Sequence, residues 1–308
     1  MTRASGRIIQ LLSLFLLLLV ASVSCRPRVR TTSLGEVVIP DHLTSPRERQ
    51  SYLIDHYWDR EEAQPTTSDS LLVHKVKDFC GLIQGAPATQ VRRSLLRSLE
   101  AFGDEGLPLA LSTYRDQLFR PESPLYDERL YSFILDWERR SMKVDSARRV
   151  EALLSLARLQ HNRVGSTAQD FRFYASDTSL MKLSEVKAPY TLLLLQVDSD
   201  RKERLWASEL KASKSLQALI QKRTLQPLMI YTGQARPDSL QRSLFTGAIL
   251  APDSAGLIAT QRRYDLSRGS VLYLLDQKKT VLLRNTTIPR VASYLDIYEK
   301  QTSPDRTP

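Results

Sequence analysis

The chain has 308 residues, which is enough for two domains of ordinary size. Hydrophobic residues make up 42% and charged residues 25%, proportions that argue against a chain disordered throughout. The formal net charge is +10, but the arginines are spread along helical patterns without a zinc-finger, RNA-binding-sheet or phosphate-loop signature. We therefore expect solvated basic helix faces and no nucleic-acid partner.

Residues 1–24 predict a secretory signal peptide. Arg3 and Arg7 form a short basic start, an apolar run follows from Leu11 to Ala21, and small residues precede position 25. The apolar stretch is shorter than the roughly 20 residues that span a bilayer comfortably, so cleavage is favoured over an uncleaved anchor. Because these residues hold two arginines and no acid, the rest of the chain carries a net charge of +8.

A cysteine follows this segment directly. The stretch Ser22–Cys25 resembles the lipobox of bacterial lipoproteins, although an aliphatic residue is usual at Ser22. The resemblance implies a lipid on Cys25 and a membrane as partner; plain secretion with cleavage before Cys25 is the alternative. Three basic residues come next: Arg26, Arg28 and Arg30. Each would add on the order of 1 kcal/mol of attraction to an anionic surface. Surface-displayed lipoproteins of the bacterial group that the chain resembles carry acids here, so the arginines favour a periplasm-facing anchor.

The first half of the remaining chain is helical in pattern. Residues 25–45, with Pro27 and Pro40, predict a tether, and residues 46–160 predict an all-helical domain of five or six helices. One helix is expected behind Asp145 or Ser146 as its cap. The clearest apolar stripes are Val91, Leu95, Leu96, Leu99 and Phe102, and then Leu153, Leu154, Leu156, Ala157 and Leu159.

The pattern changes after a break at residues 161–167. Thr191–Val197 is a continuous apolar run, typical of a strand buried on both faces, and Pro227–Thr232 predicts a second strand. One long helix is expected between them. Val271–Leu275 and Thr280–Leu283 predict a hairpin, and a last helix carries Val291 and Leu295. This order predicts an α/β sandwich of the thioredoxin type over residues 167–301, followed by a disordered tail at 302–308.

Several segments resemble known proteins. Tyr52–Asp59 and Arg120–Glu128 are similar to a helical domain of unknown function that precedes thioredoxin-like domains in envelope proteins of certain Gram-negative bacteria. Asp170–Phe173, Leu192–Val197 and Val271–Asp276 are similar to the thioredoxin-like half. The resemblance covers nearly all of the mature chain. It implies an α + α/β fold class, with an N-terminal all-helical domain followed by a thioredoxin-like α/β sandwich.

The resemblance also locates the positions of the redox site. In redox-active relatives a Cys-x-x-Cys opens the first long helix, because the helix N-terminus stabilises the attacking thiolate and the second cysteine resolves the mixed disulfide. The match puts Asp200 and Glu203 at the two cysteine positions, and Ser270 where a cis-proline shields the dithiol. No cysteine follows Cys80, so the resemblance implies a degenerate site.

Asp200 and Glu203 have the spacing of a capping box. An acid at the N-cap and a glutamate three residues later would also complement the positive end of the helix dipole. We expect these two side chains to stabilise the helix. Binding of a cation is the alternative, but no third ligand lies nearby in the sequence.

Other candidate sites are weaker. Cys80 shares an apolar helical segment with Val76, so a core position is expected rather than a peroxidatic one. His56 with Asp59 lies beside Trp58, but without HExxH-type spacing we expect packing rather than a metal site. Serine nucleophile elbows, phosphate loops and dinucleotide fingerprints are missing, so no cofactor is expected.

The sequence thus predicts a periplasm-facing membrane lipoprotein that acts as a binding or scaffolding module for an unidentified protein partner. Its thioredoxin-like domain is expected to be redox-inactive. Two alternatives stay open. The first is a thiol-disulfide oxidoreductase or peroxidase that relies on Cys80 or on the thiols of a partner. The second is a structural helper in envelope assembly.

Overall fold

The computed structural model describes residues 33–34, 37–63, 68–175, 179–197, 202–232, 243, 245, 247–253, 256–261 and 263–302. The predicted signal peptide, Cys25 and Asp200 lie outside the described residues. By its contacts the chain divides into two compact units, residues 1–66 with 82–102, and residues 67–81 with 103–308. The domain boundaries at 46–160 and 167–301 rest on the sequence alone and stay predictions.

The described residues of the first unit form a short antiparallel pair, β1 (Ser33–Leu34) and β2 (Val37–Val38), and three helices. These are α2 (Pro46–His56), α3 (Asp59–Ala63) and α5 (Ala88–Ala101). Helix α2 starts at Pro46 because the Ser45 side chain accepts the Glu48 N–H at 3.1 Å. It packs on α5, where the Ser94 hydroxyl donates to the Ile54 carbonyl at 2.6 Å.

The second unit begins with most of α4 (Asp69–Leu82), then α6 (Gly106–Leu118), α7 (Glu128–Glu138) and α8 (Ser146–Leu159). Asp127 and Asp145 cap α7 and α8, and Asp145 accepts the Arg148 N–H at 2.8 Å, as predicted for that helix. Residues 46–160 hold seven described helices rather than the five or six predicted, and one of them, α3, is only five residues long.

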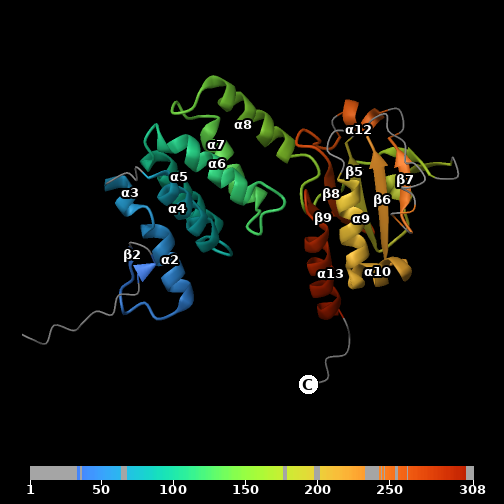
Figure 1. The fold of residues 1–308 in the computed structure, drawn as a ribbon, viewed down its shortest axis with the longest axis horizontal. Helices are drawn as coiled ribbons and strands as arrows, with labels where there is room; N and C mark the ends of the chain where they lie inside the picture. The colour runs from blue at the N-terminus through green and yellow to red at the C-terminus, as the bar shows by residue number, and fades with distance from the viewer. Residues whose placement is uncertain are drawn as a thin grey trace, which may run out of the picture. The chain divides into compact units, whose positions relative to one another are not determined.

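A five-stranded mixed sheet follows in the same unit, with strand order β7-β6-β5-β8-β9 (Figure 1). Its central strand β5 (Tyr190–Gln196) runs parallel to β6 (Leu225–Tyr231) and antiparallel to β8 (Val271–Asp276). The edges are β7 (Ile249–Pro252) and β9 (Val281–Arg284). The apolar run of β5 is explained by its central place, since both of its faces are covered.

Side chains of β5 alternate between two cores. Leu192 and Leu194 face α9 (Glu203–Ala212), α10 (Lys214–Gln221) and α13 (Ile288–Thr302), whose inward residues include Trp206, Leu216, Val291 and Leu295. Figure 1 shows α9 and α13 side by side over the strands.

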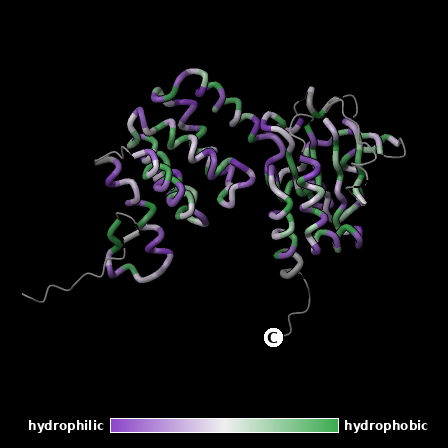
Figure 2. The backbone as a smooth tube through the Cα atoms, viewed as in Figure 1, coloured by the Kyte–Doolittle hydropathy of each residue, from purple (hydrophilic) through white to green (hydrophobic). Residues whose placement is uncertain are grey.

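The opposite face of β5, with Leu193 and Leu195, packs on an aromatic cluster. The cluster includes Phe171 and Phe173 of the segment around β3 (Arg172–Tyr174), with Tyr264 and Tyr273. The remaining short elements are β4 (Leu180–Lys182), which pairs with β3, a 3₁₀ turn at Leu183–Glu185, and α12 (Leu257–Thr260). In Figure 2 the hydrophobic colour runs along the central strands.

This architecture confirms the predicted fold class, a helical N-terminal region followed by a thioredoxin-like α/β domain. One element differs from the prediction. The long helix between β5 and β6 is two helices, because Ser213 leaves the helical conformation and accepts the Leu216 N–H at 3.4 Å to start α10. None of the described helices combines the length and apolar composition that crossing a membrane requires.

Candidate functional site

The candidate site lies at the end of β5, next to the positions that the sequence resemblance assigns to a degenerate redox site. The structure starts α9 at Glu203, and Lys202 takes the N-cap position without a side-chain cap hydrogen bond. The capping box predicted from Asp200 to Glu203 needs the glutamate as the third helical residue, and it is the first. That part of the prediction is wrong, and Asp200 itself lies outside the described residues.

Glu203 is buried at the start of α9. The residue is only 8% exposed, and the Oε2 atom of its side chain has no hydrogen-bond partner among the described residues. The positive end of the helix dipole favours a carboxylate here. Glu203 therefore occupies a position that would suit a thiolate, with a group that cannot form a disulfide.

Ser270 lies across from the end of β5. Leu195 pairs with Val271 in the β5–β8 register, and the next residue back, Ser270, is 4% exposed. Its hydroxyl oxygen accepts the Val197 N–H at 2.7 Å. Ser270 thus extends the contact between β5 and β8 by one side-chain hydrogen bond, and no peptide bond in the described residues is cis.

A cavity of about 520 Å³ opens beside these residues. This volume lies within the usual range of small-ligand sites. Its walls come from α6, the loop after α6, α8, the start of α9 and the loop before β8. The lining residues are Arg115, Asp116, Phe119, Arg120, Pro121, Glu122, Glu151, Ser155, Arg158, Lys202, Asp265, Ser267, Arg268, Ser270 and Asn285.

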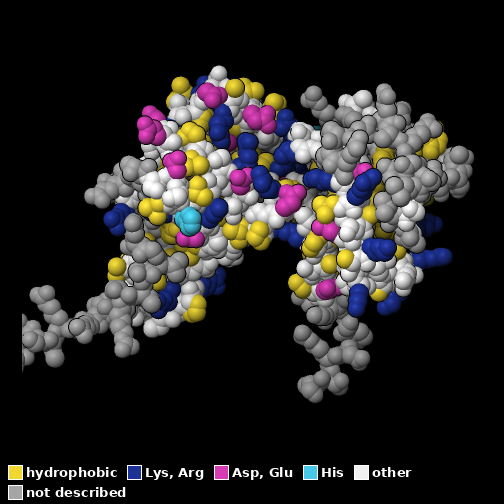
Figure 3. Space-filling view, viewed as in Figure 1, with side chains coloured by type: hydrophobic (Ala, Val, Ile, Leu, Met, Phe, Trp, Pro, Cys, Tyr) yellow, Lys and Arg dark blue, Asp and Glu magenta, His cyan; other side chains and the backbone are white. Residues whose placement is uncertain are grey.

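The described lining residues include five cations and four carboxylates, and three of the cations form ion pairs with carboxylates of the lining. Arg120 lies 2.9 Å from Asp116, Arg158 lies 3.0 Å from Glu151, and Lys202 lies 3.6 Å from Glu122. Such partly exposed pairs contribute little to stability, so a ligand can compete for them. Figure 3 likewise shows basic and acidic side chains interspersed over the visible face.

Arg115 differs from the other cations. Among the described residues no carboxylate lies within 4 Å of its guanidinium, whose Nε donates a long hydrogen bond of 3.4 Å to the Tyr131 hydroxyl. The contact with Tyr131 and the more distant charges of Glu138 and Glu151 raise the pKa of Arg115. The cavity therefore contains a permanent positive charge without a direct counter-ion.

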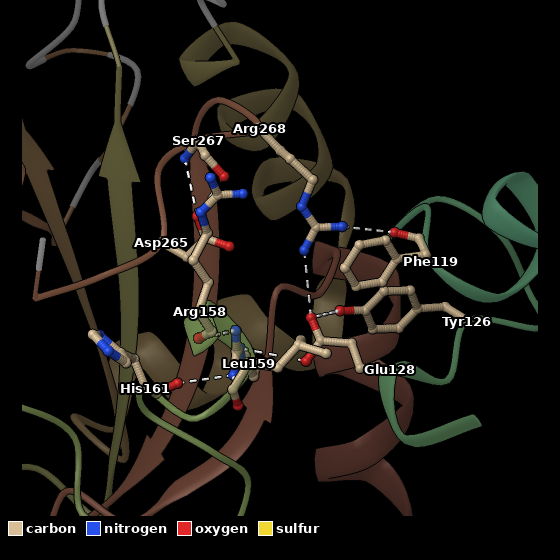
Figure 4. A network of polar contacts seen from close by, with 10 residues as sticks. Phe119, Tyr126, Glu128, Arg158, Leu159, His161, Asp265, Ser267 and Arg268 are labelled. Carbon is tan, nitrogen blue, oxygen red and sulfur yellow. Dashed lines mark hydrogen bonds and ion pairs between the residues drawn. The ribbon is translucent and has the colours of Figure 1, made fainter. Parts of the chain in front are cut away.

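Two arginines join the cavity walls to the α/β domain: Arg284, which is buried, and Arg268, which is exposed and labelled in Figure 4. Arg284 of β9 is 5% exposed and donates to three carbonyls at the end of α8. The distances are 2.9 Å to Leu159, 2.8 Å to His161 and 3.2 Å to Arg158. Carbonyls at a helix C-terminus lack intrahelical partners and carry the negative end of the dipole, so a guanidinium suits them.

Arg268 fixes the loop after α6. It donates to the Phe119 carbonyl at 2.9 Å, and its guanidinium lies 3.7 Å above the Phe119 ring. Glu128 lies 3.6 Å from Arg268 and 3.4 Å from Arg284, and it accepts the Tyr126 hydroxyl at 2.5 Å. Burial and the Glu128 charge raise the pKa of Tyr126, so this hydroxyl remains a donor at neutral pH.

Sequence reasoning missed both arginines. Arg284 ends the otherwise apolar strand Val281–Arg284, and a charge inside such a run signals a buried polar partner. Its partner lies more than 100 residues away in the chain, so the sequence alone could not name it.

A second pocket, of about 500 Å³, adjoins the first. It shares Arg158, Asp265 and Ser267 with the first cavity, and its apolar wall comes from Leu154, Ala157 and Leu266. The stripe predicted on α8 is thus largely uncovered: only Ala152 and Leu159 of this helix are buried, whereas Leu153 and Leu154 are 56% and 44% exposed.

The remaining candidates from the sequence, Cys80 and His56 with its neighbours, lie in the helical region and are not among the described residues that line this cavity. Cys80 is fully buried in α4, and burial raises the pKa of its thiol well above the ordinary value. His56 Nδ1 lies 2.7 Å from Asp59 Oδ2, and Trp58 is buried edge-on against Phe102. In the part of the chain that the structure describes, no group of three or more His, Cys, Asp or Glu could hold a metal ion.

Comparisons with protein families and with solved structures give matches for the N-terminal half and for most of the chain. Residues 20–162 match the family model described as "Domain of unknown function (DUF5106)". The crystal structure of a thioredoxin-like protein from Bacteroides caccae is similar over 87% of this chain and 99% of its own, with 22% identity and a TM-score of 0.73. At this identity the similarity shows the fold.

Two further structures cover less of the chain. The C-terminal domain of an uncharacterized protein from Bacteroides fragilis matches 44% of this chain and 98% of its own, with 29% identity and a TM-score of 0.40. A thiol:disulfide interchange protein from Bacteroides sp. matches 46% and 94%, with 12% identity and a TM-score of 0.39. No curated protein matches the chain.

Proposed function

We propose that this protein is a periplasm-facing lipoprotein that acts as a binding or scaffolding module, and that its thioredoxin-like domain binds ligand without thiol chemistry. One observation carries the proposal. At the end of β5, where the sequence resemblance implies a degenerate redox site, this chain has a charged cavity of ligand size lined by Lys202 and Ser270, with Glu203 buried beside it on α9. A carboxylate cannot form the mixed disulfide that thiol exchange requires.

The cysteines of the chain support the same proposal. The sequence has two, Cys25 and Cys80. An acylated Cys25 would have no thiol, and the Cys80 thiol is buried with a raised pKa. Since the thiolate is the nucleophile and must be reached by its substrate, both burial and the raised pKa suppress reactivity.

The envelope location rests on the N-terminal sequence. A basic start, an apolar run and a lipobox-like Ser22–Cys25 support export followed by lipidation. A membrane anchor at this end and a cavity in the second unit suit a protein that holds a ligand or partner near a membrane.

The proposal is tested by measuring thiol chemistry in the mature protein without residues 1–25. Insulin reduction and peroxide consumption are compared for the wild type, Cys80→Ala and a thioredoxin as positive control. We expect background rates in both forms of this protein. Turnover in the wild type that disappears in Cys80→Ala would overturn the proposal and establish the oxidoreductase or peroxidase alternative.

A further inference from the structure

The two adjoining pockets have complementary chemistry. From them we infer a single site for the C-terminal end of a peptide, with its terminal carboxylate in the charged cavity and a large apolar side chain in the neighbouring pocket. This inference rests on the proposed binding function and names its ligand class. Three residues, Arg158, Asp265 and Ser267, belong to both pockets, so one short ligand can occupy both.

Arg115 supplies the site for the carboxylate. It lines the charged cavity, no carboxylate of the described residues lies within 4 Å of it, and its Nε is oriented by Tyr131. A guanidinium presents paired donors that match the two oxygens of a carboxylate. The other cations of the wall have carboxylate partners, so among the described residues Arg115 is the cation of the wall without a carboxylate within 4 Å.

Asp265 supplies an acceptor on the shared wall. Its Oδ1 accepts the Ser267 N–H at 3.1 Å and the Ser267 hydroxyl at 2.6 Å, which orients the carboxylate. Among the residues that the structure describes, no hydrogen-bond donor or cation contacts Oδ2. A backbone N–H of a peptide is a donor of the right kind for this oxygen.

The apolar pocket supplies the third contact. Leu154 is 44% exposed and lines this pocket with Ala157 and Leu266. A leucine-sized side chain placed here would cover apolar surface that is now open to water, which favours binding.

Of an inorganic anion, a fatty acid and the C-terminal end of a peptide, only the peptide offers groups for all three contacts. An inorganic anion has no apolar group, and a fatty acid has no donor for Asp265. The end of a peptide carries a carboxylate, an N–H and a side chain within a few ångströms of one another, and carboxylate capture is a recurring mode of peptide recognition. Arg268 holds one wall through a partly buried hydrogen bond and Arg284 holds another through a buried one, so the site is formed before the ligand arrives.

The test uses a fluorescein-labelled pentapeptide, Ala-Ser-Gly-Ala-Leu, whose binding to the mature protein is followed by fluorescence polarisation. Two partner probes differ at one place each: a C-terminal amide replaces the carboxylate, or serine replaces the final leucine. Loss of one charge-assisted contact predicts binding about tenfold weaker for the amide. The serine peptide is expected to bind weaker by a factor of roughly 5 to 10.

Matched variants locate the site. Arg115→Gln is expected to weaken the free-acid peptide about tenfold and to remove its advantage over the amide. Leu154→Ser should remove the preference for leucine. Arg172→Gln and Leu205→Ser change an exposed arginine and an exposed leucine outside both pockets and should leave binding unchanged.

Equal affinity for acid and amide in the wild type would overturn the inference without reliance on any variant. Displacement by millimolar phosphate with no preference for leucine, or tighter binding of labelled palmitate than of any peptide, would also overturn it. If no peptide binds while thiol turnover stays at background, this inference fails and the proposed function stands. Thiol turnover would instead contradict the proposed function.

Discussion

At the scale of single residues, Lys279 shows how a buried charge is accommodated. It ends the turn between β8 and β9 with φ +63°, a conformation that usually favours glycine, and it is only 4% exposed. A lysine suits this position because its ammonium donates to the Val186 carbonyl at 2.8 Å and to the Thr191 hydroxyl at 2.9 Å. Burial lowers the pKa of Lys279.

Replacing Lys279 by methionine keeps the apolar stem and removes both donated hydrogen bonds. We expect the free energy of unfolding at pH 7 to fall by about 1–3 kcal/mol, since two buried acceptors lose their donor. Urea unfolding followed by circular dichroism measures the change. Lys278→Met, at the exposed neighbouring position, is the control and should leave stability within about 0.5 kcal/mol of the wild type.

The difference in stability between the wild type and Lys279→Met should also depend on pH. Because the folded-state pKa of Lys279 is lowered, the unfolded chain binds more protons just below the ordinary lysine pKa of 10.5. The stability of the wild type relative to Lys279→Met should therefore rise as pH increases through that window, and fall back as pH decreases. A difference that does not change between pH 8 and 10.5 would contradict the buried-charge explanation.

At the scale of elements, apolar patterns predicted the central structure well. The run at Thr191–Val197 became β5, and the hairpin of β8 and β9 was placed within a residue or two. The β3–β4 pair was missed because three-residue strands show no periodicity, and the break at Ser213 was missed because its cap interrupts an otherwise continuous stripe.

The candidate site was predictable only in part. The resemblance indicated Glu203 and Ser270 as positions of a degenerate redox site, and that assignment stays a prediction; Glu203 starts α9, and Ser270 contacts the residue after β5. Arg115 and Asp265 line one cavity from positions 150 residues apart, and nothing in their local sequence links them. Hydrophobic periodicity reports the faces of elements, whereas this site depends on which loops meet at a sheet edge.

The end of α8 supplies the prediction at this scale. Arg284→Gln removes most of the donors to three helix carbonyls and leaves Glu128 with one fewer cation, so we expect a loss of about 3 kcal/mol in urea unfolding. Arg284→Lys should recover less than half, because a point charge cannot reproduce the planar fork. Arg172→Gln, an exposed arginine on β3, should be neutral; equal losses in the three variants would contradict this account.

At the scale of the whole molecule, the envelope proposal depends on one cysteine outside the described residues. If Cys25 is lipidated, cells fed labelled palmitate should label the wild type and not Cys25→Ala, and only the wild type should sediment with membranes. Cys80→Ala is the matched control, since it removes the other cysteine and should label fully. Unlabelled wild type found soluble in the periplasm would indicate ordinary secretion.

The hydrogen bonds that hold the second unit together join distant parts of the chain. Arg268 is 149 residues from Phe119, Arg284 is 125 from Leu159, and Arg290 is 167 from Ser123, whose carbonyl it contacts at 2.7 Å. In each pair the arginine comes second. During synthesis α6 to α8 are therefore made long before the side chains that secure them. Until Arg284 is made, the carbonyls at the C-terminal end of α8 lack these hydrogen bonds. Contacts this distant in sequence form slowly. The newly made protein is thus most exposed to proteases and aggregation in the interval before its last strands arrive.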